Sequence, residues 1–112
     1  MRRGEVWWAS LSEPAGAGPG YRRPVIIVQA NEFNESGIRT VVVVVITSNL
    51  RRAAAPGNVL CRPRDTGLRR ESVANVSQLL TVDKRLLTER VGSLPSRVLA
   101  EVESGLRQVL AL

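Results

Sequence analysis

The sequence contains no histidine and only one cysteine, Cys61. Histidine is the side chain that most often carries protons near neutral pH and binds metals, so imidazole-based catalysis is excluded. A single cysteine cannot form a disulfide within the chain, and we expect a buried structural thiol. The scattered acidic residues show no spacing typical of a zinc or magnesium site. The sequence therefore predicts a protein that holds no metal.

Motifs of nucleotide-binding and membrane proteins are also missing. Neither GxxxxGK[ST] nor GxGxxG after a strand occurs, so no nucleotide cofactor is expected. The longest unbroken apolar run, Val41 to Ile46, has six residues, whereas a membrane-spanning helix needs roughly 20. The first residues carry Arg2 and Arg3, and no secretory apolar segment follows them. We expect a cytoplasmic protein without a cofactor.

Arginine, in contrast, is abundant and unevenly distributed. The net charge is +6, from 16 basic and 10 acidic residues. Up to Arg70, 11 arginines face 5 acids, whereas from Glu71 onward 5 basic residues face 5 acidic ones. Such asymmetry is typical of a surface that binds a polyanion, because each arginine near a phosphate releases a condensed counterion. Compositional drift in a GC-rich genome would give the same excess, and that alternative stays open.

The length suits a single domain, residues 1–112. Stretches of β-branched and aromatic residues have the length of strands. Five consecutive valines within residues 38–47 predict a strand that is buried on both faces. The predicted strands are 4–11, 25–28, 38–47, 59–62, 72–81 and 87–91.

A C-terminal amphipathic helix is predicted from Pro95 onward, because apolar residues recur there at spacings of three and four. Gly105 interrupts it, at a cost of about 1 kcal/mol relative to alanine. Loops are expected at 12–20, 31–37, 49–58 and 63–70. The glycine- and proline-rich loop 12–20 suits a gate or a docking segment, and an ordinary surface connection suits it equally. Short strands, basic loops and one terminal helix predict a mainly β fold, a small bent barrel of the SH3-like kind.

Arg23 and Thr47 stand at the ends of two predicted strands. RNA carries an internal nucleophile, the 2′-hydroxyl, so an enzyme can cut it without a metal if it stabilises the charge on the phosphoryl oxygens. A guanidinium pairs with two phosphate oxygens at once, and a nearby hydroxyl adds a hydrogen bond. The simpler interpretations are that Arg23 is only a solvent-exposed arginine and that Thr47 caps its strand.

Five short motifs, in order, resemble the PemK/MazF toxin family. They are Arg3-Gly4-Glu5-Val6-Trp7, Arg23 to Gln29, Val44 to Ser48, Glu71 to Leu79, and Thr81 to Leu86 with the later Val91-Gly92 and Leu94. The match covers essentially the whole chain. It implies a homodimer with an SH3-like barrel of the PemK/CcdB toxin type. It also implies the toxin of a toxin-antitoxin system, blocked by an acidic, MazE-like antitoxin.

The activity that this resemblance implies is that of an mRNA interferase. Such an endoribonuclease cuts single-stranded RNA at short sequences, without metal or ribosome, leaving a cyclic phosphate and a 5′-hydroxyl and stopping growth. Arg23 and Thr47 match the catalytic pair of the family, and Gln78 a contact to RNA. Further RNA-binding residues are expected beside the pair and in two basic loops: Arg22, Ser48, Arg51, Arg52, Arg69 and Arg70.

The chain departs from the family in the loop before Arg23. Several members carry an acidic residue there, where this chain reads Gly16-Ala17-Gly18-Pro19-Gly20, and the nearest carboxylate is Glu13. Arg23 is therefore expected to serve both charge stabilisation and proton transfer. Two alternatives remain: a non-enzymatic toxin of the same fold that poisons DNA gyrase, and a barrel that binds nucleic acid without chemistry.

Overall fold

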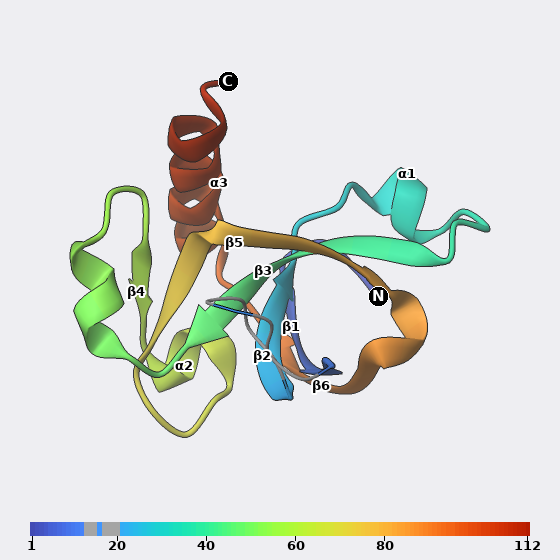
Figure 1. Ribbon diagram of the computed structural model, residues 1–112, viewed down its shortest axis with the longest axis horizontal. Helices are drawn as coiled ribbons and strands as arrows, with labels where there is room; N and C mark the ends of the chain where they lie inside the picture. The colour runs from blue at the N-terminus through green and yellow to red at the C-terminus, as the bar shows by residue number, and fades with distance from the viewer. Residues whose placement is uncertain (13–15, 17–20) are drawn as a thin grey trace.

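A single antiparallel sheet organises the chain. The computed structural model describes residues 1–12, 16 and 21–112, and within them the strand order is β4-β5-β3-β2-β1-β6. The strands are β1 Glu5–Ser10, β2 Arg22–Ile27, β3 Thr40–Thr47, β4 Val59–Cys61, β5 Ser72–Asp83 and β6 Leu87–Ser93. The sheet curls into a half-barrel, with the helix α3, Ser96–Leu110, at one end (Figure 1). The predicted fold class, a mainly β bent barrel with a C-terminal helix, is confirmed.

Four short helical segments connect the strands, three of them within predicted loops and the fourth in a stretch for which nothing was predicted. They are α1 Asn31–Asn34, η1 Leu50–Ala54, α2 Pro63–Thr66 and η2 Lys84–Leu86. The side chains of Asn49 and Asp83 accept backbone N–H groups at the starts of η1 and η2, which such single turns need because they have few bonds of their own. The long helix α3 starts at Ser96 with Pro95 as its N-cap, one position later than expected. No helix in the described ranges combines the length and apolar character that crossing a membrane requires.

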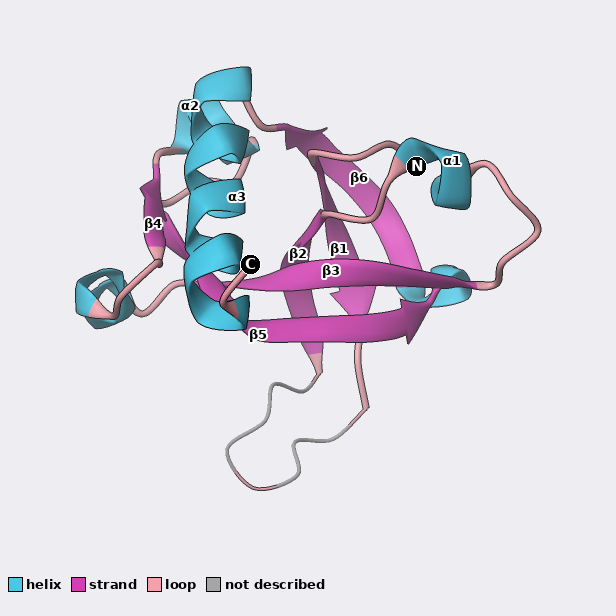
Figure 2. Cartoon of the chain, turned by 90° about the horizontal axis from the view of Figure 1, so that it is seen from above, coloured by secondary structure: helices cyan, strands magenta, loops and turns pink. Residues whose placement is uncertain are grey.

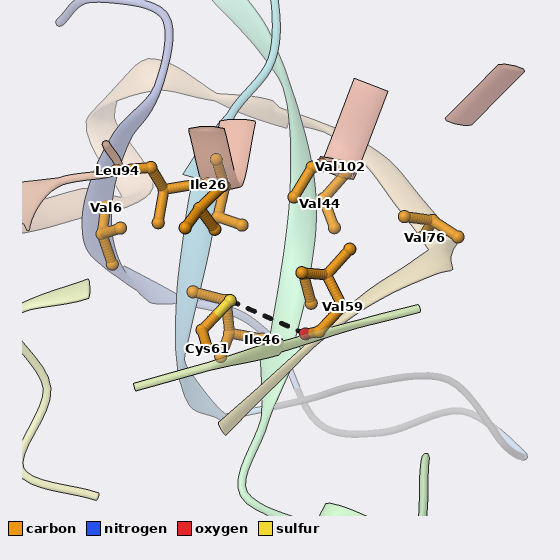
Figure 3. Packing of buried hydrophobic residues seen from close by; sticks show 11 residues of the cluster. Val6, Ile26, Val44, Ile46, Val59, Cys61, Val76, Leu94 and Val102 are labelled. Atoms are coloured by element: carbon orange, nitrogen blue, oxygen red, sulfur yellow. Dashed lines mark hydrogen bonds between the residues drawn. The ribbon is translucent and has the colours of Figure 1, made fainter. Parts of the chain in front are cut away.

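The valine-rich strand β3 is buried on both faces, as predicted. Val44 and Ile46 belong to one apolar cluster, and Val41, Val43 and Val45 to another, because successive side chains of a strand point to opposite faces. The first cluster includes residues of α3 and β4, and Figure 3 shows them meeting β1, β2 and β3. The second cluster draws on every strand except β4, which is why the sheet curls around it.

Strand β5 contains an irregularity that its alternating sequence did not reveal. Val44 of β3 pairs with Leu79, whereas the next residue, Val45, pairs with Asn75. Residues 76–78 therefore bulge from the ladder, and the uniform alternation expected for 72–81 is wrong. The backbone N–H of Val76 donates to Asn58 Oδ1 at 3.0 Å, so a side chain replaces the strand partner at this point.

Gly105 is a packing requirement of the helix and not the flaw that its propensity suggested. Figure 2 shows α3 beside β4 and β5. A Cβ placed on Gly105 would collide with the carbonyl oxygen of Gly57, and its next neighbour would be Val76 Cγ1 at 3.1 Å. Gly57 itself has a positive φ of 83°, a region that favours glycine. The helix can approach the sheet this closely only because both residues lack side chains.

Candidate functional site

The strands β2 and β3 place Arg23 and Thr47 opposite each other. Their register pairs Val25 with Val45, and both candidate residues stand two positions further along, where the same face recurs. Opposite residues of an antiparallel pair have Cβ atoms about 5 Å apart. The Arg23 side chain is exposed and Thr47 is half-buried. Continued two positions past the last pair of the ladder, this register sets Arg23 opposite Thr47, and that the two form a catalytic pair stays a prediction.

Thr47 also has a structural task. Its Oγ1 accepts the backbone N–H of Asn49 at 3.1 Å, so Thr47 does cap the end of its strand, as the simpler interpretation holds. A hydroxyl that accepts one hydrogen bond keeps its own proton for another. The bond therefore fixes the rotamer of Thr47 and leaves the hydroxyl able to donate to a ligand oxygen.

A groove of about 690 Å³ begins at this end of β2 and β3. Its lining combines basic and apolar side chains. The lining residues are Trp8, Arg22, Arg23, Pro24, Ile46, Ser48, Gly67, Leu68, Arg69, Arg70, Glu71, Ser72, Glu89, Arg90 and Val91. Five of the predicted site residues are therefore in one place: Arg22, Arg23, Ser48, Arg69 and Arg70. A groove lined by apolar side chains and arginines suits a ligand with flat apolar parts joined by anionic groups.

Thr47 does not line this groove. Ile46 and Ser48 do, and the residue between them points to the opposite face of the strand. Arg23 lies on the face of Thr47 by register, and its long side chain nevertheless reaches the groove lining. Arg23 is thus the residue that connects the groove with the predicted catalytic pair.

The far wall of the groove depends on close contact between α2 and β6. A Cβ on Gly67 would lie 2.6 Å from the Val91 carbonyl oxygen, and a Cβ on Gly92 2.7 Å from that of Thr66. Two glycines thus let the two backbones touch. The nearby Asp65 carboxylate accepts the backbone N–H of Arg62 at 3.0 Å and lies 3.6 Å from the guanidinium of Arg97. These contacts fix the start of the segment that carries Arg69 and Arg70.

The predicted RNA contacts Arg51 and Arg52 lie elsewhere, on η1, and are not part of the groove lining. Figure 1 shows η1 at the outer side of β4. The Arg51 backbone N–H donates to Asn49 Oδ1 at 3.2 Å, and the Arg52 carbonyl accepts Asn58 Nδ2 at 2.9 Å. Both arginine side chains are exposed, so they form a second basic surface and their role in RNA binding stays a prediction.

Gln78, also predicted to contact RNA, belongs to the bulge of β5. Its Oε1 accepts Asn75 Nδ2 at 3.1 Å, and Asn75 Oδ1 in turn accepts Asn58 Nδ2 at 3.2 Å and Ser77 Oγ at 3.0 Å. Gln78 is therefore engaged within the protein, and contact with RNA stays a prediction. Sequence reasoning missed the part-buried Asn58–Asn75 link, for which an asparagine between the apolar Ala74 and Val76 was the available signal.

Sequence reasoning also missed Ser72, at the start of β5. Only 4% of this residue is exposed, it lines the groove, and its Oγ is the one buried side-chain polar atom in the described part of the chain with no hydrogen-bond partner. A buried hydroxyl without a partner is costly. Its position beside the groove makes it a candidate ligand contact, and a serine next to Glu71 offered no sequence signal for this.

Two ionisable groups near the site have shifted pKa values. Burial tends to raise the pKa of Glu5, but hydrogen bonds from the Trp7 indole and the Arg2 backbone N–H, together with Arg90, bring it below its usual value. Arg90, a groove residue, lies 2.9 Å from the Glu5 carboxylate. Burial raises the pKa of Cys61 to about 11, and the expected buried thiol is found. Within the described residues, no three His, Cys, Asp or Glu side chains gather in a way that could hold a metal.

The loop predicted at residues 12–20 lies mostly outside the described residues, since only residues 12 and 16 of it are described. The predicted gate or docking role, and the place of Glu13, are therefore not addressed by the structure.

Comparison with known proteins gives a consistent result. Residues 2–110 match the family described as PemK-like, MazF-like toxin of type II toxin-antitoxin system. The chain is 46% identical over 112 residues to the endoribonuclease MazF6 of Mycobacterium tuberculosis, covering all of this chain and 98% of that protein.

Solved structures agree at the level of fold. MazF from Deinococcus radiodurans superposes with a TM-score of 0.82 at 23% identity, over all of this chain and 97% of the other. An endoribonuclease from a Mycobacterial species, solved in complex with its cognate antitoxin, superposes with a TM-score of 0.78 at 25% identity, over all of this chain and 96% of the other. The comparisons therefore agree with the family that the sequence motifs indicated.

Proposed function

Because the chain belongs to the PemK-like, MazF-like toxin family, we propose that it is the endoribonuclease toxin of a type II toxin-antitoxin system. Its substrate is single-stranded RNA, cut at a short sequence. The observation that carries the proposal is the position of Arg23 in a groove lined by further arginines, on the strand that pairs with the strand of Thr47. The naming of relatives as endoribonucleases, at 46% identity over the whole chain, supports the same class of enzyme.

The proposed chemistry is an attack of the RNA 2′-hydroxyl on the adjacent phosphorus. The bond from O2′ to phosphorus forms, the bond from phosphorus to O5′ breaks, and the products are a cyclic phosphate and a 5′-hydroxyl. Water takes the proton of the 2′-hydroxyl, Arg23 donates a proton to the departing O5′, and the guanidinium regains a proton from the solvent. The guanidinium of Arg23 and the hydroxyl of Thr47 donate to the phosphoryl oxygens as negative charge builds there. No metal takes part in these steps.

The test is incubation of the purified protein with a long single-stranded RNA in EDTA, followed by mapping of the RNA ends. We expect cleavage at a recurring short sequence with 5′-hydroxyl ends. Arg23→Ala and Thr47→Ala should each lower kcat about 10²- to 10³-fold, the usual loss when a donor to a developing oxyanion is removed. Arg107→Ala, an exposed change on α3 outside the groove lining, is the matched control.

Two results would count against the proposal. Normal cleavage by a folded Arg23→Ala variant would remove Arg23 from the mechanism. Intact RNA with the folded wild type would favour the gyrase poison or the binding barrel. A Thr47→Ala variant that binds RNA unchanged but no longer cuts it would separate catalysis from binding.

The partner that we propose is an acidic antitoxin. The chain carries a net charge of +6, and its groove combines arginines with apolar lining residues, so an acidic segment with apolar side chains suits it. A Mycobacterial endoribonuclease of the same fold was solved with its cognate antitoxin. Such a complex should weaken as salt screens the charges. An affinity that did not change with salt would contradict this account.

We also propose that the toxin is a cytoplasmic homodimer that stops growth by degrading messenger RNA. The valine-rich strand gives the dimer no support, because Val41 and Val43 to Val45 are buried within one chain. The exposed apolar residues are the better support, among them Phe33, Ile38 and Leu60. Light scattering of the protein used for the cleavage assay gives its mass, and a mass of one chain would exclude the dimer.

A further inference from the structure

Trp8, Arg22 and Glu89 form a stack on one wall of the groove. The guanidinium carbon of Arg22 lies 4.1 Å from the centroid of the Trp8 ring, and Arg22 Nη2 lies 3.3 Å from Glu89 Oε1. The three residues come from adjacent strands, because β1 pairs with both β2 and β6, and Trp8 pairs directly with Glu89. All three line the groove.

The stack leaves one flat surface available. A guanidinium is planar, and one face of Arg22 is covered by the indole of Trp8. The side chain of Arg22 remains 54% exposed, so its other face is open to a ligand. Glu89 holds the edge of the plane in place. The result is a platform fixed from below by an aromatic ring and from the side by a carboxylate.

The neighbouring charges indicate which chemical group the platform binds. Glu89 offsets part of the positive charge of Arg22 and would repel a phosphate placed beside it. Arg69 and Arg70, which also line the groove, are exposed and offer a phosphate a better partner. An unpaired nucleobase is flat and carries no charge, and it stacks on aromatic rings and on arginine planes.

From these observations we propose that Arg22, stacked on Trp8, is the platform for one unpaired base of the RNA, at a position away from the scissile phosphate. The proposal rests on the proposed endoribonuclease function. It gives Arg22 a task different from that of its neighbour Arg23: Arg22 selects where RNA binds, and Arg23 acts on the phosphate. Glu89 is a positioning residue for the platform.

The test uses a short single-stranded RNA with one mapped cleavage site, and a series in which one base at a time is replaced by an abasic ribose. For the wild type, loss of the stacked base should lower kcat/KM between about 5- and 150-fold at one position, the range for stacking of a base on a protein platform. Arg22→Lys keeps the charge and removes the plane. The variant should cut the intact RNA more slowly than the wild type does. An abasic ribose at the position of the stacked base should lower its kcat/KM no further.

Two further variants make the result specific. Arg107→Lys changes an exposed arginine outside the groove lining and should keep the wild-type profile. Glu89→Gln removes the charge and keeps the shape, so the position that depends on its base should stay the same. If Arg22→Lys still loses activity at the same abasic position as the wild type, or if Glu89→Gln shifts that dependence to another position, the platform is wrong.

The experiment distinguishes failure of the base platform from failure of the proposed nuclease function. If the wild type cuts no RNA, fluorescence anisotropy measures the affinity of the protein for each RNA of the same abasic series. A base dependence that is lost in Arg22→Lys would then support the platform without the nuclease. RNA that is cut with equal efficiency at every abasic position would overturn the platform and leave the nuclease in place.

Discussion

At the scale of single residues, burial and hydrogen bonding distinguish Cys61 from Ser72, two small polar side chains whose roles the sequence alone does not tell apart. Cys61 and Ser72 pair with each other across β4 and β5, and both are buried. The thiol has a weak partner, the Val59 carbonyl oxygen at 3.6 Å, which Figure 3 marks. The Ser72 hydroxyl has none and lies beside the groove. Sulfur tolerates apolar surroundings well, so Cys61 is structural and Ser72 is the more informative group.

The buried thiol predicts a loss of stability in alkali. The pKa of Cys61 is raised from its ordinary 9.0 to about 11 by burial, so the folded protein holds this proton more tightly than the unfolded chain. The contribution of the protonated thiol to the stability of the folded protein is therefore fully present below pH 9 and is lost as the pH rises toward 11. We expect up to about 2 kcal/mol of stability to disappear over this range. Urea unfolding of wild type and Cys61→Ala at pH 8 and pH 10.5 measures it, and equal declines in both proteins would contradict it.

At the scale of elements, the approach of α3 to the sheet is set by the pair Gly57 and Gly105. Gly105→Ala should gain about 1 kcal/mol in helix propensity and lose about 1–3 kcal/mol from overpacking, since the new methyl meets backbone that cannot move away. We therefore expect a net loss of stability, measured by urea unfolding. Ser104→Ala, an exposed change one residue earlier, should have almost no effect. A Gly105→Ala variant more stable than the wild type would show that the helix shifts at little cost.

Strands and the long helix could be predicted from the sequence because each carries its own apolar period. The valine run of β3 and the spacing along α3 are such local signals. The bulge at residues 76–78 could not be predicted, because it depends on Asn58, a residue distant along the chain that takes the backbone N–H of Val76. The short helices were missed for a different reason, since a single turn is too short to carry an apolar period.

The candidate site was predictable only in part. Arg23 and Thr47 were predicted from their chemistry and from family motifs, and the strands that carry them are paired. The cluster of Arg22, Trp8 and Glu89 was not predictable, because it requires three strands in one register. Ser72 was not predictable either, since burial without a partner is a property of packing and not of composition.

At the scale of the whole molecule, the position of charge matters more than its sum. The arginines that line the groove are Arg22, Arg23, Arg69, Arg70 and Arg90. Two of them are balanced by acids, Arg22 by Glu89 and Arg90 by Glu5. The exposed pair Arg69 and Arg70, held by the contact of α2 with β6, is therefore the part of the far wall best suited to RNA phosphates.

This assignment predicts how RNA binding depends on salt. Each phosphate neutralised on a single strand contributes about 0.7 to the slope of log affinity against log salt. Arg69→Ala with Arg70→Ala should therefore lower the slope by about 1.4, measured by anisotropy with an RNA carrying a 2′-deoxy nucleotide at the cleavage site. Arg64→Ala with Arg107→Ala removes the same charge from exposed positions outside the groove lining and should leave the slope nearly unchanged. Equal slopes for the two double variants would mean that RNA responds to the net charge of the protein, and that the groove does not direct where its phosphates lie.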